Sequence, residues 1–345
     1  MIGIAVRGMS RHPRPVRWAA VLIPLAAAVW IPQMGSSFYT SLAINVLIFG
    51  LLAMSLDLLA GYTGLVSLGH ASYLGVGAYG IAFGMSRGMS ADASIGLAMA
   101  VVLLTALVFG LVAVRVREIT FVILTLALGQ IVWGLAYRWV SVSGGDNGLP
   151  IGGRPVLGPL DLTGGTSYYY FVLVVFVICA VILWMIVRSV FGLTLRGIRG
   201  NEPRMRTLGY NTWLHKYLAF VISGVFGGIA GVLFGFYNLY VSPTTIDFSH
   251  NGQVVLMVVM GGLGTLWGPL VGAGVIVLLQ QYVSIYVTRW VTVLGIIFVL
   301  TVLFARDGLW GAFMKLLSRL LARGGGPPMT AVETENLVMT QTGVE

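Results

Sequence analysis

Charged residues are scarce in this chain. Asp, Glu, Lys and Arg make up 9% of its 345 residues, whereas they make up about 25% of an average soluble protein. Hydrophobic residues make up 58%, above the roughly 45–50% that soluble domains carry. This composition excludes an intrinsically disordered chain and a nucleic-acid-binding domain. It indicates a membrane protein, in which basic residues mark the cytoplasmic side.

Cysteine and lysine are also scarce, and each shortage excludes a type of site. The single cysteine, Cys179, leaves no internal disulfide and no multi-cysteine metal site. Neither of the two lysines, Lys216 and Lys315, follows a glycine as the lysine of a phosphate-binding P-loop does. The four histidines show no metal-ligand spacing, which argues against intramembrane proteolysis and metal transport. We therefore expect no enzyme activity, no metal site and no cofactor in this chain.

Long apolar runs fill most of the chain and stop at clusters of Gly, Pro and Arg. Because a membrane-spanning helix needs about 20 apolar residues, the length allows about ten spans with short connections. The sequence thus predicts an all-α polytopic membrane protein with about ten transmembrane helices. The predicted helices cover 18–32, 39–60, 69–85, 91–114, 119–140, 168–187, 217–240, 251–266, 268–287 and 290–305.

The basic residues support this count when both termini are placed in the cytoplasm. All 20 Lys and Arg residues then divide into 16 inside and 4 outside, as the positive-inside rule requires. The inside residues are Arg7, Arg11, Arg14, Arg17, Arg115, Arg117, Arg188, Arg196, Arg199, Arg204, Arg206, Lys216, Arg306, Lys315, Arg319 and Arg323. The outside residues are Arg87, Arg138, Arg154 and Arg289. One missed span would invert every later loop and spoil the asymmetry.

This topology divides the chain into three segments. A basic cytoplasmic segment at 1–17 precedes a transmembrane domain at 18–305, and a partly disordered cytoplasmic tail follows at 306–345. Two long connections stand out in the transmembrane domain, an outside loop at 141–167 and a basic inside loop at 188–216. Alternatively, the first apolar run is a cleaved signal peptide, because it follows basic residues and contains small ones.

Glycines repeat at four-residue spacing inside several apolar runs. Such spacing lets helix backbones approach closely in lipid, where no hydrophobic effect drives helices together. The repeats are Gly80 with Gly84, Gly227 with Gly231 and Gly235, and Gly264 with Gly268 and Gly272. They predict a tightly packed helix bundle.

Glycine-rich segments also interrupt the apolar runs, one in each half of the chain, at 61–70 and 261–269. Broken backbone at membrane depth survives only where protein or a water-filled cavity satisfies its polar groups. Paired interruptions point to a translocation pathway, but two ordinary tight turns at the cytoplasmic face explain them equally well. The candidate pathway residues are Asp57, Tyr62, Thr63, Ser67, His70, Gly261, Gly264 and Thr265.

Asp57 is the only acidic residue that we place inside a predicted span. A carboxylate at mid-bilayer costs about 3 kcal/mol, and less near the end of a helix. Gly50, Ala53 and Gly61 share its helix face, so the side chain is predicted to point into a packed interior. It is either a polar lining or gate residue, or a buried partner that orders the turn at Gly61.

The inside loop contains the pattern of a short capped helix. Asn201 is a suitable N-cap, Pro203 falls in the first turn, and Gly209 ends the helix. A short helix between two spans forms a natural contact surface for a soluble partner. Taken alone, its basic residues are equally explained as a topology signal.

Four segments together resemble the LivM-type permease of branched-chain amino acid ABC importers, over roughly 40–310. The first is 55–70 (SLDLLAGYTGLVSLGH), and the second is 143–149 (SGGDNGL). The third is 196–211 (RGIRGNEPRMRTLGYN), followed by 216–223 (KYLAFVIS). The last is 260–269 (MGGLGTLWGP), and all four occur in the family's order.

The resemblance implies a transport subunit of the bacterial inner membrane, surrounded by lipid, that works with several other chains and with no nucleic acid. These chains are a LivH-type permease, two cytoplasmic LivG/LivF-type ATPases that carry ATP and Mg, and a periplasmic substrate-binding protein. The segment at 196–211 resembles the family's coupling helix. Its candidate ATPase-coupling residues are Arg196, Arg199, Asn201, Glu202, Leu208 and Gly209. Here Arg204, Met205 and Arg206 stand where small residues are common, which is a departure from the general importer pattern.

Three alternatives stay open. A related urea or short-amide permease would carry Arg in the segment where this chain has Leu263. An ion-coupled secondary transporter would use Asp57 and need no ATPase. A membrane scaffold without transport activity would show no substrate phenotype on deletion.

Overall fold

The computed structural model describes residues 30–116, 118–157 and 160–286, together with 292–293, 295–297, 299 and 308–311. The predicted helices at 18–32 and 290–305 lie largely outside these residues, as does most of the tail at 306–345. The basic segment at 1–17 and the alternative signal peptide also lie outside them.

The described chain is helical almost throughout, and all eight predicted helices from 39–60 to 268–287 are present. A 3-10 turn, η1 (Ile31–Met34), leads into α3 (Ser37–Asp57), which continues as the π-helix η2 (Leu58–Thr63). Next come α4 (Ala71–Ser86), α5 (Ala91–Ala113), α6 (Glu118–Arg138), α7 (Val140–Ser143) and the 3-10 turn η3 (Gly145–Asn147). After the outside loop follow α8 (Gly165–Arg188), α9 (Val190–Gly200), α10 (Glu202–Thr207) and α11 (Thr212–Asn238). The 3-10 turn η4 (Pro243–Ile246), α12 (Phe248–Gly261) and α13 (Gly268–Tyr286) complete the order.

The few strands are two residues long and lie in the loops. Strand β1 (Leu149–Pro150) pairs antiparallel with β4 (Tyr240–Val241), in the register Leu149 to Val241. Strand β2 (Val156–Leu157) pairs with β3 (Leu160–Asp161) inside the outside loop. The first pair attaches this loop to the end of α11.

Three predicted boundaries need correction. The helix predicted over 251–266 ends at Gly261, because Gly262, Gly264 and Leu266 have positive φ angles that a helix cannot accommodate. The first interruption begins at Gly64 and not at Gly61, since η2 carries the helix to Thr63. The inside loop at 188–216 is mostly helical, since α9 covers its first half and α10 lies in its second half.

Six of the described helical segments are long and apolar enough to cross a membrane. They are Ser37–Thr63, Ala91–Ala113, Ile119–Arg138, Gly165–Arg188, Thr212–Asn238 and Gly268–Tyr286. Helices α4 and α12 have 16 and 14 residues, so each is shorter than a full span. The chain is therefore a multi-pass membrane protein of the all-α class.

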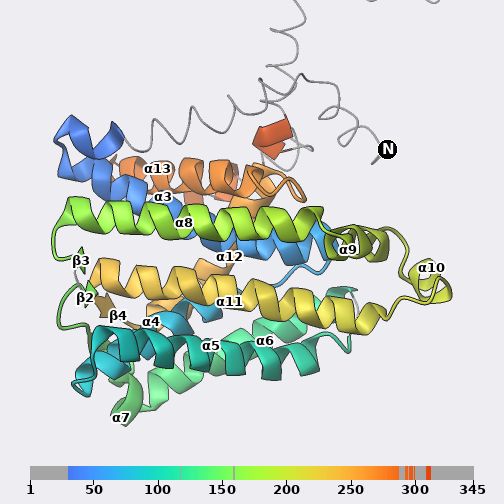
Figure 1. Cartoon of the computed structure of the whole chain (residues 1–345), viewed down its shortest axis with the longest axis horizontal. Coiled ribbons are helices and arrows are strands. Elements are labelled where there is room, and N and C mark those ends of the chain that lie inside the picture. The colour runs from blue at the N-terminus through green and yellow to red at the C-terminus, as the bar shows by residue number, and fades with distance from the viewer. Residues whose placement is uncertain are drawn as a thin grey trace, which may run out of the picture.

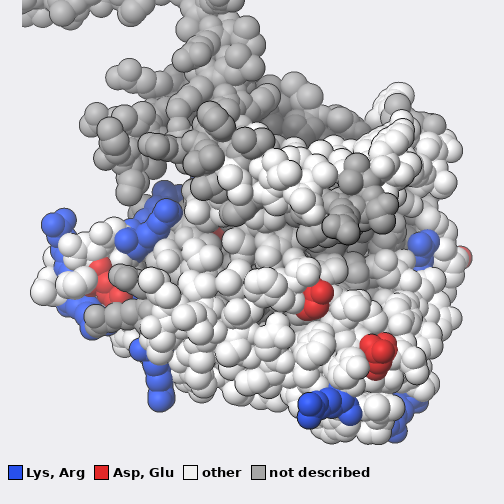
Figure 2. All heavy atoms as spheres, turned by 180° about the vertical axis from the view of Figure 1, so that it is seen from behind, with Lys and Arg blue, Asp and Glu red and all other residues white. Residues whose placement is uncertain are grey.

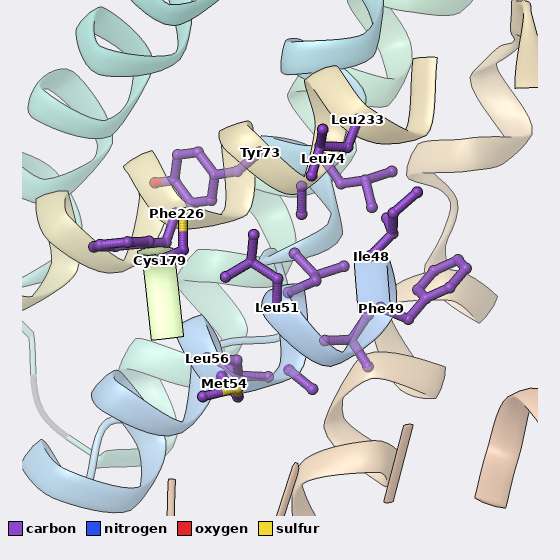
Figure 3. Packing of buried hydrophobic residues seen from close by; sticks show 14 of the residues in the cluster. Ile48, Phe49, Leu51, Met54, Leu56, Tyr73, Leu74, Cys179, Phe226 and Leu233 are labelled. Carbon is purple, nitrogen blue, oxygen red and sulfur yellow. The ribbon is translucent and has the colours of Figure 1, made fainter. Parts of the chain in front are cut away.

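The core lies around α3, which packs against α8, α11, α12 and α13. Figure 3 shows how α3 places Ile48 and Leu51 toward Leu74 of α4 and Leu233 of α11. In an 18-residue apolar window of each span, 78% of the residues are buried for the span containing α3 and 72% for α11, against 22% for α5 and for α6. Helices α3 and α11 are thus internal, and α5 and α6 present apolar surface outward.

The glycine repeats do pack helices closely, as predicted. A Cβ atom on Gly231 of α11 would lie 2.1 Å from the carbonyl oxygen of Leu74 in α4. A Cβ atom on Gly272 of α13 would lie 1.9 Å from the carbonyl oxygen of Met257 in α12. The repeat on α4 meets α5, where a Cβ atom on Gly80 would lie 2.6 Å from Ala98 Cα. At these contacts only glycine allows the backbones to approach.

The two long loops lie at opposite ends of the bundle. Figure 1 shows α9 and α10 extending beyond one end, with the short strands of the outside loop at the other. Figure 2 shows Lys and Arg gathered at the α9–α10 end and a mostly uncharged surface along the middle of the bundle. An apolar middle between polar ends is the surface that a bilayer requires.

Candidate functional site

Helix α10 is capped as the sequence predicts. The side-chain oxygen of Asn201 accepts a hydrogen bond from the backbone N–H of Arg204 at 2.9 Å, and Pro203 occupies the first turn. The helix ends before Gly209, whose φ of +88° is readily adopted only by glycine. Local sequence therefore determines both ends of this six-residue helix.

The carboxylate of Glu202 connects α10 to the start of α11. One oxygen accepts hydrogen bonds from Arg206 at 2.7 Å and from the Thr212 hydroxyl at 3.0 Å. The other accepts from the ammonium of Lys216 at 3.0 Å, and Lys216 is 5% exposed. Partial burial raises the pKa of Glu202, but the hydrogen bonds from Lys216 and Arg206 outweigh burial and hold the pKa below its ordinary value.

The outer face of α10 is left free by these contacts. No residue of α10 is buried, and Leu208, immediately after it, is 65% exposed. Leu208 and Gly209, two of the predicted coupling residues, are both exposed. An exposed leucine directly after a helix with two arginines is a surface that a protein partner can cover.

The end of α3 lies against the second interruption. Asp57, which is 0% exposed, accepts a hydrogen bond from the N–H of Gly264 at 2.7 Å with one carboxylate oxygen. Its other oxygen accepts from the N–H of Leu266 at 3.0 Å. The side chain thus points into the protein, as predicted from its helix face. Its hydrogen-bonding partners are backbone amides of the second interruption. The sequence offered two interpretations of Asp57, a lining or gate residue and a partner of the turn at Gly61, and neither identified these amides.

Gly61 lies where η2 touches the second interruption. A Cβ atom there would lie 2.1 Å from a carboxylate oxygen of Asp57 and 2.3 Å from the nitrogen of Gly264. Gly264 has a φ of +80°, and a Cβ atom on it would lie 3.0 Å from the carbonyl oxygen of Gly61. No larger residue fits at Gly61 without moving backbone.

Two predicted coupling residues on α9 reach this contact. The guanidinium of Arg199 donates a hydrogen bond to the carbonyl oxygen of Gly61. The guanidinium of Arg196 lies over the ring of Tyr62, 4.8 Å from its centroid. The structure therefore brings Arg196, Arg199 and Tyr62 together with the Asp57 contact, in one cluster at the end of α3.

The remaining candidate pathway residues serve the local backbone or a separate polar cluster. Thr63 donates to the carbonyl oxygen of Leu59, and Thr265 donates to that of Gly262 at 2.7 Å. Ser67 accepts from the N–H of Gly69 at 3.3 Å. Gly261 is the last residue of α12, and a Cβ atom there would meet the carbonyl of Gly268.

His70 lies away from Asp57, at the start of α4, in a buried polar cluster. Its Nε2 atom lies 2.8 Å from the Ser55 hydroxyl, while Ser55 donates to the carbonyl oxygen of Leu52 at 2.7 Å. Ser223 of α11 donates to the carbonyl oxygen of Ser55. This cluster ties α3, α4 and α11 together, and Ser55 and Ser223 were not among the predicted site residues.

Lys216 and Thr212 were also missed, although a lysine next to an apolar run is a visible signal. Only two lysines occur in the chain, and Lys216 follows the basic loop directly. Its carboxylate partner is 14 residues away, so spacing alone does not identify it.

No group of three or more His, Cys, Asp or Glu side chains in the described residues could hold a metal ion. The three charged side chains at α10 pair among themselves, since Arg206 and Lys216 both bind the carboxylate of Glu202, and Asp57 binds backbone amides. The site therefore has two parts. One is the exposed surface at α10, which a protein partner can bind, and the other is the buried junction between Asp57 and the second interruption.

Comparisons with known proteins identify a family of transport permeases. Residues 38–304 match the family described as "Branched-chain amino acid transport system / permease component". The chain is 26% identical over 313 residues to the high-affinity branched-chain amino acid transport system permease protein LivM of Salmonella typhimurium, covering 83% of this chain and 73% of the relative. LivM of Escherichia coli is 26% identical over 314 residues, covering 84% of this chain and 73% of the relative.

A shorter match links the chain to a permease named for another solute. The guanosine ABC transporter permease protein NupQ of Bacillus subtilis is 30% identical over 102 residues, which cover 29% of each chain. No solved structure matches the chain.

Proposed function

This chain belongs to the branched-chain amino acid permease family, and from that premise we propose that it is the inner-membrane permease subunit of an ATP-driven importer of branched-chain, hydrophobic amino acids. The observation that carries the proposal is the family match across 38–304, which includes both interruptions and α10. It acts as a transport subunit and not as an enzyme.

The partners follow from the division of labour in such importers. A LivH-type permease pairs with this chain, two LivG/LivF-type ATPases bind below, and a periplasmic binding protein delivers the amino acid. ATP and Mg bind the ATPases, because this chain has no P-loop. The exposed α10 with Leu208 supports the ATPase contact, for which Arg196, Arg199, Asn201, Glu202, Leu208 and Gly209 are the proposed residues.

The topology that we propose has ten spans, with both termini in the cytoplasm. The inside loop at 188–216 then meets the ATPases, and the outside loop at 141–167 faces the periplasm. Their positions at opposite ends of the bundle support this arrangement (Figure 1). The domain limits at 1–17, 18–305 and 306–345 belong to the same proposal.

The paired interruptions are proposed to border the translocation pathway. The end of α3 accepts hydrogen bonds from the second interruption through Asp57, so the two can shift together when the permease changes between outward-open and inward-open states. The polar groups of Tyr62, Thr63, Ser67, His70 and Thr265 lie in or beside these segments. Both carboxylate oxygens of Asp57 already accept backbone amides, which disfavours an ion-coupled transporter that uses this residue.

The test is uptake of labelled leucine in a strain that lacks this chain, with and without a plasmid-borne copy. We expect rescue by the plasmid, inhibition by unlabelled isoleucine and valine, and no inhibition by urea. Leucine uptake that is the same with and without the chain would contradict leucine as its substrate. Urea, a short amide and guanosine would then be tested with the partner chains present, because a similar permease of Bacillus subtilis is named for guanosine.

A further inference from the structure

Arg199 lies where the two interruptions meet. Besides its hydrogen bond to the Gly61 carbonyl, its side chain lies 3.1 Å from a Cβ position on Gly64. One guanidinium nitrogen lies 3.2 Å from a Cβ position on Gly264, in the second interruption. One side chain from α9 therefore touches both broken segments.

Contacts continue from Arg199 to α10 in one direction. The sulfur of Met205 in α10 lies 2.7 Å from a Cβ position on Gly197 in α9, so the two short helices pack directly on each other. Arg196, one residue before Gly197, lies over the ring of Tyr62. Helix α10 thus cannot shift far without moving α9 and its two arginines.

Contacts continue from Arg199 to the core in the other direction. Gly61 is too close to Gly264 for the two backbones to slide independently, and Asp57 holds Gly264 and Leu266 by hydrogen bonds. A displacement of η2 must therefore carry the 262–267 segment with it.

Electrostatics explain why an arginine suits this position. The carbonyls at the end of a helix lack intrahelical partners and carry partial negative charge, which a cation stabilises. The carboxylate of Asp57 lies one turn earlier and is attracted to Arg199 as well. The planar guanidinium offers several donors at once, unlike the ammonium of lysine.

We propose that Arg199 is a positioning residue that transmits movement of α10 to the paired interruptions, so that ATP hydrolysis by the partner chains changes the core of this permease. The inference rests on the proposed function, since it requires an ATPase at α10. It adds a specific mechanical connection, which runs from α10 through Met205, Gly197 and Arg199 to Gly61 and Gly264.

The test uses the complete complex, with both permeases, the ATPases and the binding protein, in liposomes. Labelled leucine uptake and ATP hydrolysis are measured in the same sample and expressed as leucine transported per ATP. Three variants are compared with the wild type, namely Arg199→Ala, Arg199→Lys and the control Arg87→Ala. Arg87 is a matched control, because it lies outside the 188–216 loop and its guanidinium lies over Phe83 of α4, 5.0 Å from the ring centroid.

We expect Arg199→Ala to lower leucine per ATP by about tenfold, the usual scale of coupling between two sites, while hydrolysis continues. Arg199→Lys should restore part of the loss, and Arg87→Ala should leave the ratio unchanged. Because Arg199 is partly exposed, its variants should still assemble. A purely structural role would reduce the amount of complex and leave the ratio unchanged.

The outcomes are separable. A wild-type complex without ATP-dependent leucine uptake would overturn the proposed importer and the premise of the inference with it. A coupled wild type with an equally coupled Arg199→Ala variant would overturn the role of Arg199 alone. If Arg199→Ala fails to assemble, an unchanged ratio in assembled Arg199→Lys overturns that role.

Discussion

Removal of the Asp57 carboxylate tests the junction between the end of α3 and the second interruption. The variant Asp57→Ala deletes the acceptors of two backbone N–H groups, those of Gly264 at 2.7 Å and Leu266 at 3.0 Å. Hydrogen bonds to a charged group contribute about 1.5–3 kcal/mol each, so the two bonds are worth about 3–6 kcal/mol. Relief from burying the charge offsets part of this, and we expect a loss of about 2–4 kcal/mol.

The variant Asp57→Asn separates the charge from the shape. An amide keeps one oxygen that accepts from one N–H, but its NH2 group faces the other donor. The expected loss is about 1–3 kcal/mol, the penalty of one unsatisfied buried donor. The control is Asp92→Asn, an exposed residue in the first turn of α5, where loss of the charge costs about 0.3–1 kcal/mol.

The assay is unfolding of the purified full-length chain by SDS in mixed micelles, followed by the loss of helical circular dichroism. The order of stability should be wild type, Asp92→Asn, Asp57→Asn and Asp57→Ala, from most to least stable. If Asp57→Ala unfolds together with Asp92→Asn, the two amide contacts do not stabilise the fold, and the argument for the junction is refuted.

Four further predictions test other parts of the molecule. Gly272→Ala should destabilise the chain by about 1–3 kcal/mol through overpacking, because its Cβ atom would meet the Met257 carbonyl oxygen; Gly96→Ala, with nothing within 4 Å, is the control and should be neutral or stabilising. Glu202→Ala should lower leucine uptake about tenfold, since it leaves the buried ammonium of Lys216 without its carboxylate partner. An assembled variant with normal uptake would contradict a coupling role. The pKa of Glu202 is depressed, so the carboxylate should stabilise the folded loop above its ordinary pKa of 4.5 and lose this effect as pH falls through the lower folded value; ATPase pull-down should therefore persist at pH 5 and weaken below pH 4.5. Leucine uptake should survive an ionophore at constant ATP and stop on ATP depletion; the reverse would support an ion-coupled transporter.

Local features of the sequence predicted most of the helices and one complete motif. The apolar runs located the eight helices between 39 and 287, because a lipid environment leaves few alternatives to a helix. Asn201, Pro203 and Gly209 predicted α10, since each determines the backbone within a few residues of itself. The helix α9 was missed, because only Ser189 marks its start and its amphipathic pattern occupies a short loop.

The candidate site was only partly predictable. Asp57 was singled out because an acid inside a span is costly, and its burial is confirmed. Its partners were not predictable, since the backbone N–H groups of Gly264 and Leu266 carry no residue-specific signal. The same holds for the Gly61 carbonyl that binds Arg199. Whether these residues border a pathway or couple to an ATPase stays a prediction.

The sequence by itself determined that the chain is an α-helical membrane protein, that its apolar runs are interrupted once in each half, and where a capped helix leaves the bundle. Composition, periodicity and capping act over a few residues, so they can be read in order along the chain. Only the tertiary structure decided that the end of α3 touches the second break, since Asp57 and Gly264 are 207 residues apart. It also decided that Arg199 donates a hydrogen bond to the carbonyl oxygen of Gly61, which lies 138 residues earlier in the chain. Such contacts depend on which helix faces meet, and close packing at glycine determines those faces.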